Sequence, residues 1–404
     1  MNEAVLSIDA DPSKPEVVER LYDWYELMRE KAPVHYIEPL KVYFVSRYQD
    51  VVDCLFDPDT FSAENAHENP IATVPVLPGA DNPRHDVQRR LIARSFTPKG
   101  VQSLSATVQK MADDLVDQFA ADGKCDLVDR FAHPYPLRVI AHIFGVPHDA
   151  KDFRRWSDAM FAAAFGASED QMVAAFEVVD ELGQWVRGLA DERREMLRAG
   201  KPLPNDLLTT FVTPGEDGEV LTTEEFVVAS LQLLNGGHET TTKLIANTLY
   251  LLMTHPDQLQ AVRQKPELMR GAIEESLRCE SPAQGEWRRT TRDVTLHGVH
   301  IPADSRLYLG FASGNRDPRV FTDPQRFDIQ RPPTEVGKHL ALGRGMHVCL
   351  GAHLARMDAA IALNTLLRRL PNLRMDPERK PRPCPLHWMR GYEELHVLWD
   401  AVQR

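Results

Sequence analysis

Apolar residues with helical spacing dominate the chain. Several long segments repeat apolar positions every three or four residues, which is typical of amphipathic or buried helices. Such helices are predicted at about 101–121, 171–198, 222–254, 258–279 and 350–370. Alternating apolar and polar residues, which favour strands, occur at 42–45 and at about 287–309. No internal repeat or low-complexity linker interrupts this pattern, so we expect a single mainly α domain with small β-sheets over residues 1–404.

Composition and charge exclude several classes of protein. Of the 404 residues, 43% are hydrophobic, and the net charge is −12. An acidic chain without a basic run argues against a nucleic-acid partner. The first 20 residues are acidic where a signal peptide is basic, and no apolar stretch reaches the roughly 18 to 20 residues that span a bilayer. We therefore expect a cytoplasmic protein without a membrane partner.

One of the five cysteines stands in a context that suggests a ligand. The others, at 54, 125, 279 and 384, form no Cys-x-x-Cys pair, which argues against disulfides and structural zinc. Cys349 follows a glycine-rich loop and precedes an apolar helix, whose N-terminus is expected to lower the thiol pKa and favour a metal-binding thiolate. Gly343, Gly345 and Gly351 carry no Cβ, so a flat macrocycle could approach the sulfur. A buried structural cysteine is the alternative interpretation.

The helix predicted at 222–254 contains an unusual polar segment. Gly236 and Gly237 lie side by side in its middle, where each costs about 1 kcal/mol relative to alanine. Close approach of a ligand to the backbone explains them, and so does a kink without chemistry. Glu239 and Thr240 follow, and a threonine can open the helical hydrogen-bond ladder locally.

Residues suited to binding carboxylates occur in three separate segments. His85 and Arg89 share one helix face, Arg288 lies in the β-rich region, and His347 lies in the cysteine loop. Arginine binds carboxylates through two parallel hydrogen bonds. Taken singly, each of these residues is an ordinary basic surface residue.

Together these segments resemble the cytochrome P450 family, over nearly the whole chain from about residue 20. Residues 342–351 match the family pattern Phe-Gly-x-Gly-x-His-x-Cys-x-Gly, except that Leu342 replaces the phenylalanine beside the sulfur. This replacement affects the redox tuning of the iron more than haem binding. The resemblance implies an α-rich triangular prism with haem b between the oxygen helix and the cysteine-loop helix.

The resemblance also implies a role for each of these residues. Cys349 becomes the axial ligand of the haem iron, and Glu239 and Thr240 become the acid and alcohol that assist dioxygen activation. The remaining cofactor-binding positions are His85, Arg89, Arg288 and His347, which would bind the haem propionates, together with Gly343, Gly236 and Gly237. A structural charge triad of Glu275, Arg278 and Arg326 is implied as well.

The implied function is that of a haem-thiolate monooxygenase that hydroxylates, epoxidises or dealkylates a small organic substrate. Its electrons would come from a separate ferredoxin and ferredoxin reductase. A basic face formed by Arg90, Arg94, Arg344 and Arg356 is predicted to dock an acidic ferredoxin. A haem-thiolate peroxygenase or isomerase and a non-enzymatic haem protein are the alternatives. Asn235 either faces the substrate or bonds within its helix.

Overall fold

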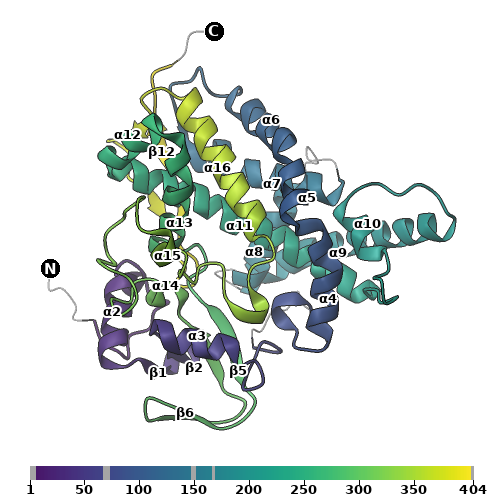
Figure 1. Cartoon of the computed structure of the whole chain (residues 1–404), viewed down its shortest axis with the longest axis horizontal. Helices are drawn as coiled ribbons and strands as arrows, with labels where there is room; N and C mark the ends of the chain where they lie inside the picture. The colour runs from purple at the N-terminus through teal and green to yellow at the C-terminus, as the bar shows by residue number, and fades with distance from the viewer. Residues whose placement is uncertain (1–5, 67–72, 147–151, 166–168, 402–404) are drawn as a thin grey trace.

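The computed structural model describes residues 6–66, 73–146, 152–165 and 169–401. A large assembly of helices packs beside a smaller region of strands and short helices near the N-terminus (Figure 1). The α-helices are α1 (Pro15–Val18), α2 (Leu21–Lys31), α3 (Tyr48–Phe56), α4 (Arg84–Ala93), α5 (Pro98–Ser103), α6 (Ser105–Val116), α7 (Pro134–Phe144), α8 (Asp152–Phe165), α9 (Glu169–Arg198), α10 (Leu207–Val212), α11 (Thr223–Thr254), α12 (Pro256–Gln264), α13 (Met269–Cys279), α14 (Phe311–Gly314), α15 (Pro333–Val336) and α16 (Ala352–Arg369).

Short strands build the β-region and three small outlying sheets. The strands are β1 (Val34–Ile37), β2 (Val42–Val45), β3 (Phe61–Ser62), β4 (Lys124–Asp126), β5 (Glu286–Thr290), β6 (Val294–Leu296), β7 (Val299–Ile301), β8 (Arg306–Leu309), β9 (Arg374–Met375), β10 (Arg382–Pro383), β11 (Tyr392–Glu394) and β12 (His396–Leu398). The largest sheet has the order β1-β2-β8-β5-β3, with β2 parallel to β8 and the other pairs antiparallel. The strands predicted at 42–45 and within 287–309 are therefore confirmed.

The long helix α11 forms the centre of the helical region. Its N-terminus is closed by a capping box, in which Thr222 and Glu225 each accept a hydrogen bond from the other's backbone N–H. Helices α7, α9, α13 and α16 all contact it. Because α11 is enclosed in this way, polar side chains in its middle are held inside the molecule. In the described part of the chain, no helix is long and apolar enough to cross a membrane.

Two of the five predicted helices are each divided into two shorter helices in the structure. The helices predicted at 171–198, 222–254 and 350–370 are present as α9, α11 and α16, with ends that differ by one or two residues. The single helix predicted at 258–279 is wrong. Pro266, whose backbone has no N–H to donate, starts a 3-10 turn that separates α12 from α13. The segment predicted at 101–121 likewise forms two helices, α5 and α6, which meet at Leu104.

The predicted structural charge triad has a different third member. Arg278 donates two hydrogen bonds to the fully buried carboxylate of Glu275, at 2.7 and 2.9 Å. Arg331, and not Arg326, completes the group, because its Nε lies 3.0 Å from both Glu275 oxygens. The side chain of Arg326 is 67% exposed, and only its backbone carbonyl accepts from Arg278. The prediction of Arg326 was wrong because both arginines lie in an irregular segment, where the spacing of residues along the sequence does not determine which side chain points toward Glu275.

Candidate active site

Two glycines and a distant helix set the shape of the cysteine loop. Gly343 and Gly345 adopt positive φ angles of 67° and 69°, where a side chain is strained. A Cβ on Gly345 would also lie 2.6 Å from the carbonyl oxygen of Leu55 at the end of α3. The loop is closed by the N–H of Cys349, which donates to the carbonyl of Leu342 at 2.8 Å. The thiol is therefore held on a rigid turn just before α16.

The expected depression of the Cys349 pKa is not observed. Helix α16 begins at Ala352, so the thiol lies before the helix and not within its first turn. Cys349 is exposed as a residue, but protein atoms packed around the thiol still desolvate it and raise its pKa. The backbone N–H of Gly351 bonds the sulfur and lowers the pKa only in part. The position of the thiol before a helix therefore does not by itself lower its pKa, and that part of the expectation is wrong.

The four predicted propionate ligands come together from three distant segments. The rings of His85 and His347 are in edge contact, with centroids 4.5 Å apart. Arg89 donates to the carbonyl of Val348 at 2.8 Å, which fixes α4 to the cysteine loop. Burial lowers the pKa of His347 to about 3, and the nearby cations Arg288, His85 and Arg89 add to this effect.

This cationic cluster has buried polar atoms without partners. Both ring nitrogens of His347 and Nδ1 of His85 form no hydrogen bond with any described residue. The nearest carboxylate, that of Asp86, lies 3.4 Å from His85 Nδ1 but extends into solvent. Arg288 is buried, and its guanidinium donates to the carbonyl of Trp287. Buried imidazole groups without hydrogen-bond partners, set beside two arginines, are suited to an anion, so the residues fit the two propionates of haem b.

Helix α4, which carries His85 and Arg89, is tied to the start of α11 through one carboxylate. Arg84 donates to Glu225 Oε1 at 2.6 Å, and Gln88 donates to the same oxygen at 2.9 Å. Burial raises the pKa of Glu225, but these hydrogen bonds outweigh it and bring the pKa down to about 2. The carboxylate therefore stays ionised and fixes the position of the cationic cluster relative to α11.

The polar segment in the middle of α11 separates into two faces. A Cβ on Gly236 would meet nothing within 4 Å, whereas one on Gly237 would lie 3.0 Å from Ile140 of α7. Close packing against α7 therefore accounts for a glycine at position 237, and its role beside the cofactor stays a prediction. Thr240 Oγ1 donates to the carbonyl of Gly236 at 2.6 Å. The Oδ1 atom of Asn235 is buried and has no partner among the described residues.

Glu239 lies in a cluster that the sequence did not indicate. Its carboxylate is buried near His133 and His238, and ligand atoms of all three side chains lie within 4.8 Å of one another. The sequence interpretation left His238 without a role and did not consider His133. No motif marks His133, which precedes α7 and is about a hundred residues from α11 in the chain.

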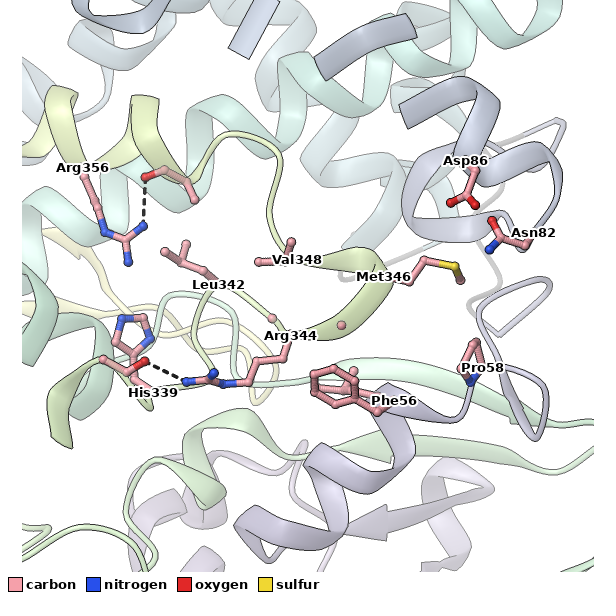
Figure 2. A pocket seen from close by; sticks show the side chains of 15 residues that line it. Phe56, Pro58, Asn82, Asp86, His339, Leu342, Arg344, Met346, Val348 and Arg356 are labelled. Carbon is pink, nitrogen blue, oxygen red and sulfur yellow. Dashed lines mark hydrogen bonds between the residues drawn. The ribbon is translucent and has the colours of Figure 1, made fainter. Parts of the chain in front are cut away.

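A groove of about 800 Å³ runs along the cysteine loop (Figure 2). It is lined by Leu55, Phe56, Pro58, Asn82, Asp86, Gly337, His339, Leu342, Gly343, Arg344, Gly345, Met346, Val348, Ala352 and Arg356. Cys349 itself is not among the lining residues, although its neighbour Val348 is. Phe56 and Val348 place exposed apolar side chains along it.

The four arginines predicted to form a basic face carry less free charge than expected, and of these Arg344 and Arg356 line the groove. Arg356 is paired with Glu274 at 2.5 Å, and Arg90 is paired with Asp217. Arg94 and Arg344 bond backbone carbonyls and have no acidic partner among the described residues. Two of the four arginines therefore keep an uncompensated charge.

Comparison with known proteins agrees with this geometry. The model of the family described as Cytochrome P450 matches residues 22–392. Cytochrome P450 107B1 of Saccharopolyspora erythraea is 37% identical over 92% of this chain and 93% of its own length. Cytochrome P450 monooxygenase PikC of Streptomyces venezuelae is 36% identical over 94% of this chain and 91% of its own length. The crystal structure of CYP109E1 from Bacillus megaterium with testosterone superposes with a TM-score of 0.86 at 32% identity, over 96% of this chain and all of that one.

Proposed function

The chain belongs to the cytochrome P450 family and is a haem b monooxygenase, and from this premise we propose how its residues divide the work. Cys349 binds the haem iron, while His85, Arg89, Arg288 and His347 bind the propionates. The observation that carries this assignment is the group of basic side chains whose buried ring nitrogens have no hydrogen-bond partner among the described residues, held by Arg89 to the loop that bears Cys349. Gly343 gives the cysteine loop its turn, and Gly236 leaves open space on α11.

The reaction consumes one dioxygen, two electrons and two protons, and it converts a C–H bond of the substrate into C–OH with release of one water. The haem supplies dioxygen binding and O–O cleavage, for which thiolate ligation donates electron density. The residues of the chain supply position and protons. Glu239 and Thr240 lie next to each other on α11, so an acid and an alcohol are available on the same turn.

The hydrogen bond of Thr240 defines what its hydroxyl can do. The hydroxyl proton is donated to the carbonyl of Gly236, while the oxygen lone pairs remain free to accept. Thr240 therefore holds a water by accepting a hydrogen bond from it, and Glu239 returns a proton to that water after the water has given one up. The hydrogen bond from Thr240 also occupies the backbone carbonyl of Gly236, and this weakens the backbone hydrogen bonding of α11 at that point.

The groove along the cysteine loop is the proposed docking surface for the electron donor, a small ferredoxin supplied by its reductase. Phe56 and Val348 provide apolar contact, and Arg344 provides positive charge. Since Arg344 is the one arginine of the lining without an acidic partner among the described residues, the reduction rate should fall only modestly between low and physiological salt.

The test of the ligand assignment is Cys349→Ala. We expect the variant to lose the red-shifted Soret band of the ferrous carbonyl complex and the monooxygenase activity, because alanine offers no ligand to the iron. Cys125→Ala, a partly buried cysteine of β4, is the control and should keep both. A carbonyl spectrum of wild-type intensity in Cys349→Ala would contradict the assignment.

A further inference from the structure

The carboxylate of Glu239 lies near three basic groups but is not held tightly by any of them. Its Oε1 lies 3.6 Å from Nδ1 of His238 and 3.9 Å from Nε2 of His133, and its Oε2 lies 3.7 Å from Nζ of Lys243. These distances exceed those of hydrogen bonds, which are about 2.7 to 3.2 Å. The carboxylate can therefore turn toward a new partner without breaking a strong bond.

His133 stands between Glu239 and a second carboxylate. Its Nε2 lies 3.4 Å from Oδ1 of Asp158 on α8 and 3.9 Å from Glu239. The exposed fraction of the side chain is 9% for Glu239, 12% for His133 and 57% for Asp158. The three groups thus form a series from the interior of α11 to solvent. A small rotation of the His133 side chain moves the same N–H from one carboxylate to the other.

His238 holds the two outer members in place and does not titrate with them. Its Nε2 donates to the backbone carbonyl of His133 at 3.0 Å, so Nδ1 carries no proton and accepts from the Ser157 hydroxyl at 2.5 Å. Ser157 directly precedes Asp158 on α8. Burial lowers the pKa of His238 to about 3, and the charge of His133 lowers it further. The neutral ring therefore links the backbone of His133 to the helix turn that bears Asp158.

A metal site is the other interpretation of this cluster. His133, His238 and Glu239 are close enough together to share an ion. Both ring nitrogens of His238 are already used, however, which leaves two of the three side chains free to bind. A structural zinc ion takes four protein ligands and a catalytic one takes three, so the arrangement favours proton handling.

We propose that Asp158 and His133 are the outer part of a proton path that ends at Glu239 and Thr240. The inference rests on the proposed function and extends it from the acid–alcohol pair to the protein surface. Solvent protonates Asp158, which passes the proton to Nε2 of His133, and the imidazolium passes it to Glu239. Each group regains a proton from its outer neighbour, so two passages supply the two protons consumed per dioxygen. His133 acts through Glu239 and does not touch the reacting atoms.

The charged surroundings provide a matched control. Arg154 on α8 lies 3.8 Å from Asp158 and donates to Asp129 at 3.0 Å. Asp129 is 54% exposed, close to the value for Asp158, but among the described residues it forms no hydrogen bond or ion pair with His133. Asp129→Asn therefore removes the same charge from the same surface without interrupting the path.

The experiment compares His133→Gln, Asp158→Asn and Asp129→Asn in the enzyme reconstituted with its redox partners. Product per reduced nicotinamide, hydrogen peroxide and the solvent isotope effect on turnover are measured. In His133→Gln, product formation should fall about tenfold, with more peroxide and a larger isotope effect. This is less than the roughly 10²–10⁴-fold that a positioned acid or base at the reacting group contributes, because His133 acts through Glu239. In Asp158→Asn, product formation should fall about two- to threefold, with more peroxide and a larger isotope effect. Asp129→Asn should match the wild type in all three quantities. Substrate-induced spectral shifts and the carbonyl spectrum should be unchanged in all three.

A measurement without turnover gives a second readout. In the ferrous carbonyl protein, the ring ¹⁵N shifts of His133 should respond to Glu239→Gln and to Asp158→Asn, while His238 keeps its neutral Nε2–H form. Wild-type coupling and isotope effect in His133→Gln, with uncoupling in Glu239→Gln, would overturn the path and leave the role of Glu239 intact. If Glu239→Gln is itself fully coupled, the proposed function of the acid is wrong.

Discussion

Two groups of buried cations in this protein differ in whether the chain supplies their anion. In the first group, Arg278 and Arg331 share the carboxylate of Glu275, and backbone carbonyls satisfy their remaining N–H groups. In the second group, the guanidinium groups of Arg288 and Arg89 lie with the rings of His85 and His347, whose lowered pKa values keep them neutral, and no buried carboxylate among the described residues pairs with them. The first group is complete as folded and serves the architecture, whereas the second is complete only with an anionic ligand.

The largest effect is a loss of stability, expected when the group around Glu275 loses one of its arginines. Arg331→Ala removes two hydrogen bonds to a buried carboxylate and should lower the free energy of unfolding by about 3 to 5 kcal/mol. Arg326→Ala, which leaves the network intact, should change it by less than about 0.5 kcal/mol. Denaturant unfolding of the two variants measures both values. Equal losses in the two variants would show that Arg331 is not the third member of the network.

The incomplete group predicts opposite effects with and without haem. Arg288→Ala removes a buried cation from a repulsive cluster, so the apoprotein should be as stable as the wild type or more stable. Haem affinity should fall by about 1.5 to 3 kcal/mol, the value of a hydrogen bond to a charged group. Haem transfer to an acceptor protein and unfolding of the apoprotein provide the two measurements. If apoprotein stability fell as it does for Arg331→Ala, the two groups would not differ in kind.

A buried carboxyl without a cation extends the comparison and gives the smallest effect. Burial raises the pKa of Asp358 on α16 well above its ordinary value, and its Oδ1 has no partner among the described residues. The folded state therefore keeps the proton that the unfolded state loses near pH 4, so stability falls as pH rises above that value. Asp358→Asn removes this loss and should be stabilising by about 1 kcal/mol at pH 8, but not at pH 4. The free energy of unfolding of the variant and the wild type, measured at both pH values, tests this. A gain in stability that does not depend on pH would contradict the role of the buried proton.

The sequence predicted what lies within one segment better than what is formed between segments. The cysteine loop and the glycines of α11 were identified from neighbouring residues, and the position of His347 followed from the same motif. The network arginine was misassigned because Arg331 and Arg326 lie in an irregular segment without periodicity. His133 was missed because its relation to Glu239 exists only after α7 packs on α11. The catalytic and haem-binding roles stay predictions until the variants are measured.

The contact between Gly345 and Leu55 has a consequence for biogenesis. The cysteine loop can take its shape only against the end of α3, and Arg89 joins the same loop at Val348 across 259 residues of sequence. During synthesis the N-terminal side of this contact leaves the ribosome long before its partner does. Cofactor capture is therefore a late event that follows long-range assembly, and the unfinished chain exposes the surfaces around α3 and α4 until then. Haem supply and chaperone protection should accordingly limit the yield of active protein at the end of translation.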